Sequence, residues 1–148
     1  MVDTRIHGRE EQLGVSNAQT NDTNRTLLGA DQFQWLKTEL LNSNCKWKAI
    51  GNQVVMAEVT IFGVPFNSDA WDGYPAQRNK LFDFIINNNL DNFCVLTGDI
   101  HTSWAIDLKK GNDKVGVEFV TTSVTSPSIP INASFLITIE NSHVKYVE

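Results

Sequence analysis

The sequence is poor in cysteine, in basic residues and in long apolar runs, and each shortage excludes a class of protein. Two cysteines, Cys45 and Cys94, allow at most one disulfide and form no CxxC pair, so neither a disulfide scaffold nor a structural zinc site is expected. Both are expected to be free thiols, with Cys94 buried because its neighbours are apolar. Twelve Lys and Arg against seventeen Asp and Glu give a net charge of -5, which disfavours a general binder of nucleic acid or of anionic membranes.

No apolar run approaches the roughly 18 to 20 residues that a membrane-spanning helix needs. The first residues also lack the apolar core and cleavage site of a signal peptide, so for an exported protein the signal would lie upstream. What the chain does have is 148 residues with 41% hydrophobic and 20% charged side chains, a composition that suits one globular domain or part of one.

The first half of the sequence predicts a polar loop followed by a helix and short strands. Residues 3–26 are polar without apolar periodicity and predict a surface loop. Asp31 is expected to cap an amphipathic helix that ends at 42–44. Residues 47–50 and 54–62 are then expected to be extended.

The second half predicts one further helix and a β-rich remainder. After a loop, residues 76–87 show the apolar face of a helix. The run 93–97 is apolar without alternation, which is typical of a strand covered on both faces. Four later segments alternate in the manner of strands, with a turn at 109–113: residues 104–108, 115–120, 135–140 and 144–147. The expected fold class is therefore α/β (α+β).

The strongest local signal for chemistry is Gly98-Asp99-Ile100-His101, placed where the buried strand ends. In an extended stretch, Asp99 and His101 would leave the backbone on the same face and converge on one point. A carboxylate with an imidazole suits a transition metal or an acid/base pair. The alternative is an ordinary turn in which Asp99 accepts from a backbone amide and His101 is polar surface.

The loop Asp69–Pro75 carries two amphipathic aromatics, Trp71 and Tyr74, without helical or strand period. We expect Trp71, Asp72 and Tyr74 to border a substrate pocket, although they could simply cover the following helix. Arg78, which follows this loop, could clamp a phosphate through two hydrogen bonds or lie on a helix surface.

The run 118–127 ends a predicted strand in a cluster of hydroxyl groups that includes Ser123. Hydroxyl groups of this kind can bind phosphate oxygens or a sugar. A solvated loop is the other interpretation of the same run.

Taken together, the motifs resemble those of the alkaline phosphatase D (PhoD-like) family of metallophosphoesterases. The resemblance rests on several motifs that occur in the same order over most of the chain: Asp3-Thr4-Arg5 with Gly8-Arg9, Leu28-Gly29 with Gln32 and Trp35-Leu36, Trp47-Lys48, Asp69 to Pro75 with Arg78, Leu96 to His101 with Ser103-Trp104, and Glu118 to Thr121 with Ser123.

The resemblance implies an αββα sandwich and the hydrolysis of phosphomonoesters or phosphodiesters by an exported, periplasmic or extracellular enzyme. It also implies iron and calcium ions with a metal-bound nucleophile. In that family the Gly-Asp-x-His stretch supplies metal ligands, which assigns Asp99 and His101 as ligands and catalytic residues. A histidine near the leaving group could also donate a proton to it.

The family's other ligands come from an N-terminal half, so residues 1–148 are interpreted as one partial domain, the C-terminal half of the catalytic domain. This chain alone is expected to be inactive and to self-associate as a homo-oligomer through the surface that the other half would cover. The rival interpretations are a non-enzymatic half-domain and a β-rich ligand-binding module that uses no metal.

Overall fold

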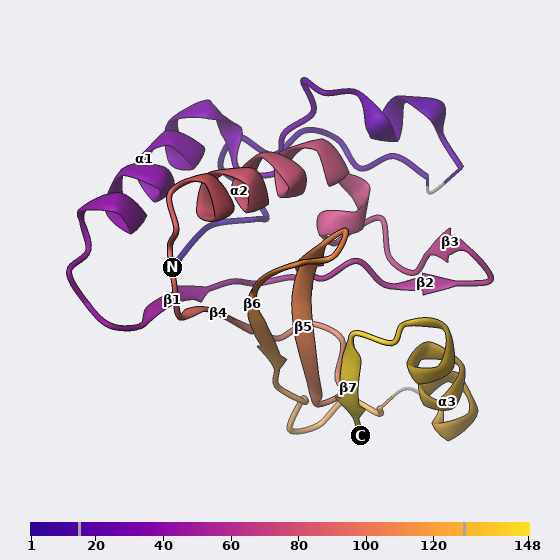
Figure 1. The fold of residues 1–148 in the computed structure, drawn as a ribbon. Helices are drawn as coiled ribbons and strands as arrows, with labels where there is room; N and C mark the ends of the chain where they lie inside the picture. Colours follow the sequence, from indigo (N-terminus) through magenta and orange to yellow (C-terminus); the bar gives the residue numbers. More distant parts are fainter. Residues whose placement is uncertain (15, 129) are drawn as a thin grey trace.

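The computed structural model describes residues 1–14, 16–128 and 130–148, so position 15 of the predicted polar loop lies outside the described residues. The fold is a mixed α/β arrangement, as the sequence predicted (Figure 1). Its elements in chain order are η1 (Ala18–Asn21), α1 (Gly29–Asn42), β1 (Lys48–Gly51), β2 (Thr60–Ile61), β3 (Val64–Pro65), η2 (Trp71–Gly73), α2 (Pro75–Asn87), β4 (Phe93–Thr97), β5 (Trp104–Lys110), β6 (Asp113–Val120), α3 (Ile131–Glu140) and β7 (Val144–Val147).

A five-stranded mixed sheet forms the centre of the molecule, in the order β1-β4-β6-β5-β7. Strands β1, β4 and β6 are parallel, whereas β5 runs antiparallel to both β6 and β7. The turn predicted between the first two alternating segments joins β5 to β6 and pairs Lys110 with Asp113. Three of the four predicted alternating segments are therefore strands of this sheet.

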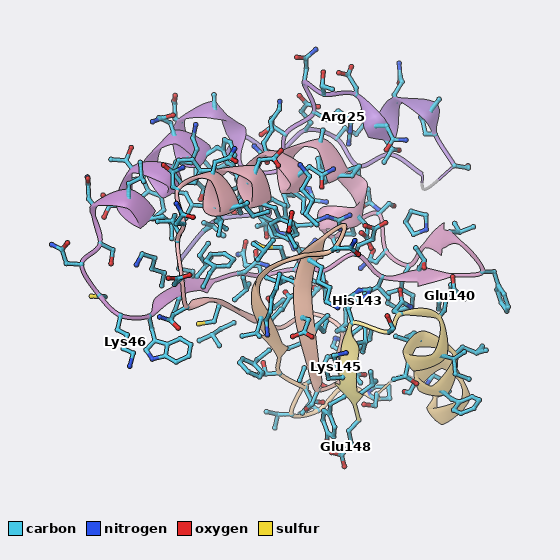
Figure 2. The ribbon with its side chains drawn as sticks, viewed as in Figure 1. Arg25, Lys46, Glu140, His143, Lys145 and Glu148 are labelled. Carbon is cyan, nitrogen blue, oxygen red and sulfur yellow. The ribbon has the colours of Figure 1, made fainter. Side chains whose placement is uncertain are left out.

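The fourth segment, residues 135–140, was predicted to be a strand but belongs to helix α3. Alternating Ile and Phe residues fit either structure when the segment is short, and here the backbone amide of Ser134 donates to the carbonyl of Pro130 and begins a helical turn. Glu140, the last residue of α3, lies beside the β2–β3 hairpin (Figure 2). Its carboxylate holds the hairpin by accepting hydrogen bonds from the backbone amides of Phe62 and Gly63, each at 2.6 Å.

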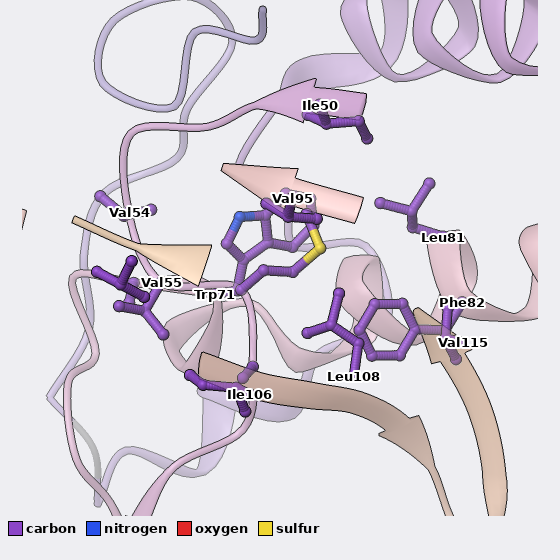
Figure 3. Packing of buried hydrophobic residues seen from close by; sticks show 14 of the residues in the cluster. Ile50, Val54, Val55, Trp71, Leu81, Phe82, Val95, Ile106, Leu108 and Val115 are labelled. Atoms are coloured by element: carbon purple, nitrogen blue, oxygen red, sulfur yellow. The ribbon is translucent and has the colours of Figure 1, made fainter. Parts of the chain in front are cut away.

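The core lies between helix α2 and one face of the sheet (Figure 3). Leu81 and Phe82 of α2 are buried together with Val95 of β4 and Leu108 of β5. Strand side chains point alternately to the two faces, so β4 buries every second residue, and Leu96 is 52% exposed. The prediction that both faces of β4 are covered is therefore wrong for the described residues.

The opposite face of the sheet carries a row of exposed apolar side chains, which we call the outer row: Leu96, Phe119 and Tyr146. Leu96 of β4 pairs with Phe119 of β6, and Ala105 of β5 pairs with both Phe119 and Tyr146 of β7, so the row crosses four neighbouring strands. Each member is about half exposed. Cys94 lies on this face as well and is only half-buried, contrary to the prediction, because the neighbours of a strand residue point the other way. Both cysteines are free thiols, as predicted.

Residues 54–62 were predicted to be extended, yet only Thr60–Ile61 of this segment form a regular strand, β2. Helix α1 also begins earlier than predicted, at Gly29, and Asp31 lies in its first turn instead of capping it. The backbone amides of Leu27 and Leu28 donate to the side-chain oxygen of Gln77 on α2, at 2.7 and 2.9 Å. These bonds tie the start of α1 to α2. Among the described helices, none is long and apolar enough to cross a membrane.

The substitution Gln77→Leu removes the acceptor for two buried amides and should lower the free energy of unfolding by about 2–4 kcal/mol, since each unsatisfied buried donor costs about 1–3 kcal/mol. Chemical denaturation measures the effect. The matched control is Gln34→Leu on the exposed face of α1, which should change stability by less than about 0.5 kcal/mol. Equal effects of the two substitutions would contradict this role of Gln77.

Candidate functional site

The candidate site begins where β4 ends, at the turn Gly98-Asp99-Ile100-His101. The turn isn't extended: φ is 83° at Asp99 and 56° at His101, and both values are in the left-handed region that non-glycine residues rarely adopt. The prediction that an extended backbone sends both side chains to one face is therefore wrong in its geometry. Strained backbone of this kind persists only where the surroundings hold it, and it gathers at functional sites.

Hydroxyl groups after β6 hold this turn. The carbonyl of His101 accepts from the side-chain hydroxyls of Thr122 and Ser128, each at 2.9 Å. The carbonyl of Thr97 accepts from the backbone amide of Thr121 at 2.8 Å. The hydroxyl of Ser123 donates to the carbonyl of Ser126 at 2.7 Å. The hydroxyl run predicted to bind phosphate or sugar thus donates chiefly to backbone carbonyls.

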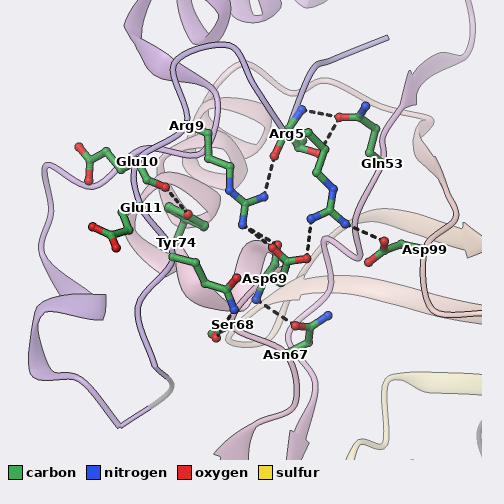
Figure 4. Close-up of polar contacts among 12 residues, drawn as sticks. Arg5, Arg9, Glu10, Glu11, Gln53, Asn67, Ser68, Asp69, Tyr74 and Asp99 are labelled. Carbon is green, nitrogen blue, oxygen red and sulfur yellow. Dashed lines mark hydrogen bonds and ion pairs between the residues drawn. The ribbon is translucent and has the colours of Figure 1, made fainter.

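An ion-pair cluster joins Asp99 to two other loops (Figure 4). Arg5 donates to the carboxylate of Asp99 at 2.7 Å and to that of Asp69 at 2.5 Å. Arg9 donates to the other oxygen of Asp69 at 2.6 Å and to the carbonyl of Thr4 at 2.7 Å. Burial raises the pKa of Asp69, but its hydrogen bonds to Arg5 and the charges of both arginines outweigh burial and hold the pKa below its usual value.

The N-terminal loop that carries these arginines is itself ordered by Asp3. Its carboxylate accepts from the backbone amides of Arg5, Ile6 and His7 at 2.8 to 3.2 Å. These hydrogen bonds favour the charged form and lower the pKa of Asp3. Arg5 and Asp69 were not predicted as site residues, because no local pattern connects Arg5 to Asp99, which lies 94 positions away.

The two aromatics of the loop Asp69–Pro75 lie in the core, not at a pocket. Trp71 and Tyr74 are fully buried, and Figure 3 shows Trp71 among the aliphatic side chains of the core. The Tyr74 hydroxyl donates to the carbonyl of Glu10 at 2.6 Å, and the guanidinium group of Arg25 lies 4.8 Å from the centre of the Tyr74 ring. The side chains of Trp71 and Tyr74, which were expected to border a substrate pocket, are therefore packed inside the protein in this structure.

Asp72 and Arg78 form a buried ion pair instead of facing substrate. Both side chains are about 5% exposed, and the guanidinium group donates to the Asp72 carboxylate. The other oxygen of Asp72 accepts from the backbone amide of Val59 at 3.1 Å. Burial raises the pKa of Asp72, and the charge of Arg78 opposes that rise. With their polar groups engaged with each other, neither residue is free to clamp a phosphate in this structure.

Asp99 and His101 fit a metal ion by chemistry but supply only part of a coordination sphere. A carboxylate oxygen and an imidazole nitrogen suit a transition metal, and both residues lie at the surface. Within the described part of the chain, no group of three or more His, Cys, Asp or Glu side chains converges as a metal site. Two residues leave most of the positions around a metal to other donors.

Replacing Asp69 by Asn should destabilise the protein by about 1–2 kcal/mol at neutral pH, because two arginines lose their shared charged partner. The pKa of Asp69 is lowered in the folded state, so this contribution is present above the unfolded pKa and is lost as the pH falls through the folded pKa. Denaturation midpoints of parent and variant should therefore converge in acid.

The control is Asp113→Asn at the exposed end of the β5–β6 hairpin, which should show little difference at any pH. A destabilisation by Asp69→Asn that is unchanged down to strongly acidic pH would contradict an electrostatic role.

A family model, a relative and a solved structure all match this chain and point to the same family. Residues 1–148 match the model of the PhoD-like phosphatase family. Alkaline phosphatase D of Bacillus subtilis (strain 168) is 40% identical over 139 residues, which cover 85% of this chain and 24% of that protein. A solved structure described as that of PhoD superposes with a TM-score of 0.89 at 36% identity, over 99% of this chain and 31% of the solved one. The chain thus spans about a quarter to a third of the length of these relatives, and it belongs to the PhoD-like phosphatase family.

Proposed function

We propose that this chain forms part of the active site of a metal-dependent phosphoric ester hydrolase of the PhoD type. The observation that carries the proposal is the strained turn of Asp99 and His101 at the end of a central parallel strand, within a chain that matches the family from end to end. Ligand and catalytic groups of α/β proteins gather at the carboxyl ends of such strands. The substrate is a phosphate ester.

Asp99 and His101 are the residues that would hold a metal ion. When bound, the metal would polarise phosphoryl oxygens and lower the pKa of an oxygen nucleophile. A histidine nitrogen cannot bind a metal and donate a proton at the same time, so we assign His101 primarily as a ligand. Arg5 orients the Asp99 carboxylate through its 2.7 Å hydrogen bond and offsets negative charge where an anionic ester would approach.

We further propose that residues 1–148 are the C-terminal half of the catalytic domain and that the other ligands come from the remaining part. The family resemblance makes iron and calcium the proposed ions, which agrees with a mixed nitrogen and oxygen donor set for iron and oxygen donors for calcium. The resemblance is also the basis for proposing that the whole protein acts in the periplasm or outside the cell.

In a protein that supplies the rest of the domain, His101→Ala and Asp99→Asn should each lower p-nitrophenyl phosphate hydrolysis by at least about 100-fold and reduce the bound metal, because each removes a ligand. Elemental analysis is run beside kinetics. His143→Ala is the control, since the His143 ring contacts the carbonyl of Glu58 instead of the turn after β4. Metal content and activity at the parent's level in His101→Ala would refute the assignment.

A second candidate role is self-association through the outer row of Leu96, Phe119 and Tyr146. Contiguous exposed apolar side chains on a sheet favour contact with another surface, and a second copy of this chain presents the same row. This role needs no metal, which separates it from hydrolysis.

The 148-residue chain alone should show no phosphatase turnover with added iron and calcium, because two ligands cannot fix the metals. It should form a concentration-dependent oligomer in light scattering, and Phe119→Lys should shift it toward monomer by placing a charge in the apolar contact. Lys114→Glu at the exposed start of β6 is the matched control. Turnover that a chelator abolishes would show that the site is complete in this chain or between its copies.

A further inference from the structure

Glu118 is a fully buried carboxylate that the proposed mechanism does not use. It lies on β6, and its two oxygens accept from the backbone amides of Met56 and Ala57, each at 2.8 Å. The side-chain hydroxyl of Thr97 donates to the same carboxylate at 2.5 Å. With a longer contact from the Met56 amide at 3.1 Å, each oxygen accepts two hydrogen bonds, so four converge on this one side chain.

These donors come from the two segments that meet at the candidate site. Thr97 is the last residue of β4 and stands directly before the strained turn. On its other side, the side-chain amide of Asn52 donates to the Thr97 hydroxyl at 3.3 Å, and the Asn52 backbone amide donates to the carbonyl of Leu96 at 2.9 Å. Glu118 thus connects the end of β4 to the irregular segment 52–59.

Satisfying the buried amides of Met56 and Ala57 accounts for an acceptor at this place, and the bond from the Thr97 hydroxyl gives the same acceptor a second role at the end of β4. Burial raises the pKa of Glu118, and hydrogen bonds from Thr97, Met56 and Ala57 together with the charge of Arg78 oppose that rise. Well-packed apolar side chains often stabilise a core as well as or better than buried charges do. What an apolar side chain cannot do is accept three donors in one fixed arrangement and so define where the end of β4 lies.

We propose that Glu118 and Thr97 are positioning residues for Asp99 and His101: the carboxylate fixes the Thr97 hydroxyl, and Thr97 fixes the backbone from which the turn departs. The expected effect on catalysis rests on the proposed function. The expected effect on the conformation of the turn does not. Neither residue touches the substrate or the metal. Both act by holding two positive-φ residues in one conformation, which the hydroxyls of Thr122 and Ser128 hold from the other side.

The structural test uses the 148-residue chain and the backbone amide resonances of Asp99 and His101. Thr97→Val keeps the shape of the side chain and removes its hydroxyl, and it should displace both resonances. Thr97→Ser restores the hydroxyl and should return them toward the parent positions. Thr60→Val is the control, because it removes a hydroxyl that contacts Asn141, the residue directly after α3. Resonances that move equally in Thr60→Val, or stay in place in Thr97→Val, would overturn the proposal.

The catalytic test uses a protein that supplies the rest of the domain. Thr97→Val and Glu118→Gln should lower kcat by about 10- to 100-fold with KM changed much less, the range typical of residues that orient metal ligands. Thr97→Ser should stay within about threefold of the parent. If Glu118→Gln does not fold, Thr97→Val alone carries the test, because it removes a single hydroxyl.

The outcomes separate the two proposals. An inactive parent would refute the proposed function while leaving the resonance test valid. An active parent whose kcat is the same in Thr97→Val would refute the positioning role while leaving the function intact. A lower melting temperature in Thr97→Val with unchanged kcat and unchanged resonances would show that the hydroxyl only stabilises the fold.

Discussion

An irregular stretch of backbone in the core is the constraint on which much of this structure depends. Residues 52–59 have little regular structure, and their amide groups need acceptors because unsatisfied buried donors are costly. Two carboxylates supply them: Glu118 accepts from Met56 and Ala57, and Asp72 accepts from Val59. Burying the Asp72 carboxylate in turn requires a partner of opposite charge, which is the guanidinium group of Arg78. The irregular segment 52–59 therefore accounts for the buried charged side chains that surround it.

These buried contacts decide which polar side chains remain at the surface, where a substrate can reach them. Asp72 and Arg78 are engaged with each other, and Trp71 packs in the core with its backbone amide bonded to the carbonyl of Val55. In contrast, the ion-pair cluster around Asp99 lies at the surface. In this cluster Arg5 connects Asp69 to the strained turn. Our proposal therefore assigns the chemistry at this end of the sheet to Asp99 and His101, and the aromatic loop supports the fold around them.

Much of the fold could be predicted because its elements have local signatures. Helix α2 and strands β4 to β7 follow from periodicity and turn residues, whereas α3 was missed because 135–140 alternates like a strand over only a few residues. The candidate site was predicted from Gly98 at a strand end, but the prediction of an extended backbone there was wrong. Contacts such as Arg5 with Asp99 or Thr97 with Glu118 join residues 94 and 21 positions apart, and no local pattern encodes them.

The composition of β4 predicts more cover than the described residues provide. Its apolar run predicts cover on both faces, yet only the face toward α2 is covered, and Leu96 remains half exposed beside Phe119. This chain corresponds to 24% of one relative and 31% of another, so the same strand can lie in a larger domain there. If the outer row is covered in the whole protein, β4 and β6 are held from both faces. Glu118 and Thr97 would then connect a rigid sheet to the strained turn, which is the arrangement that a metal site in fixed geometry requires.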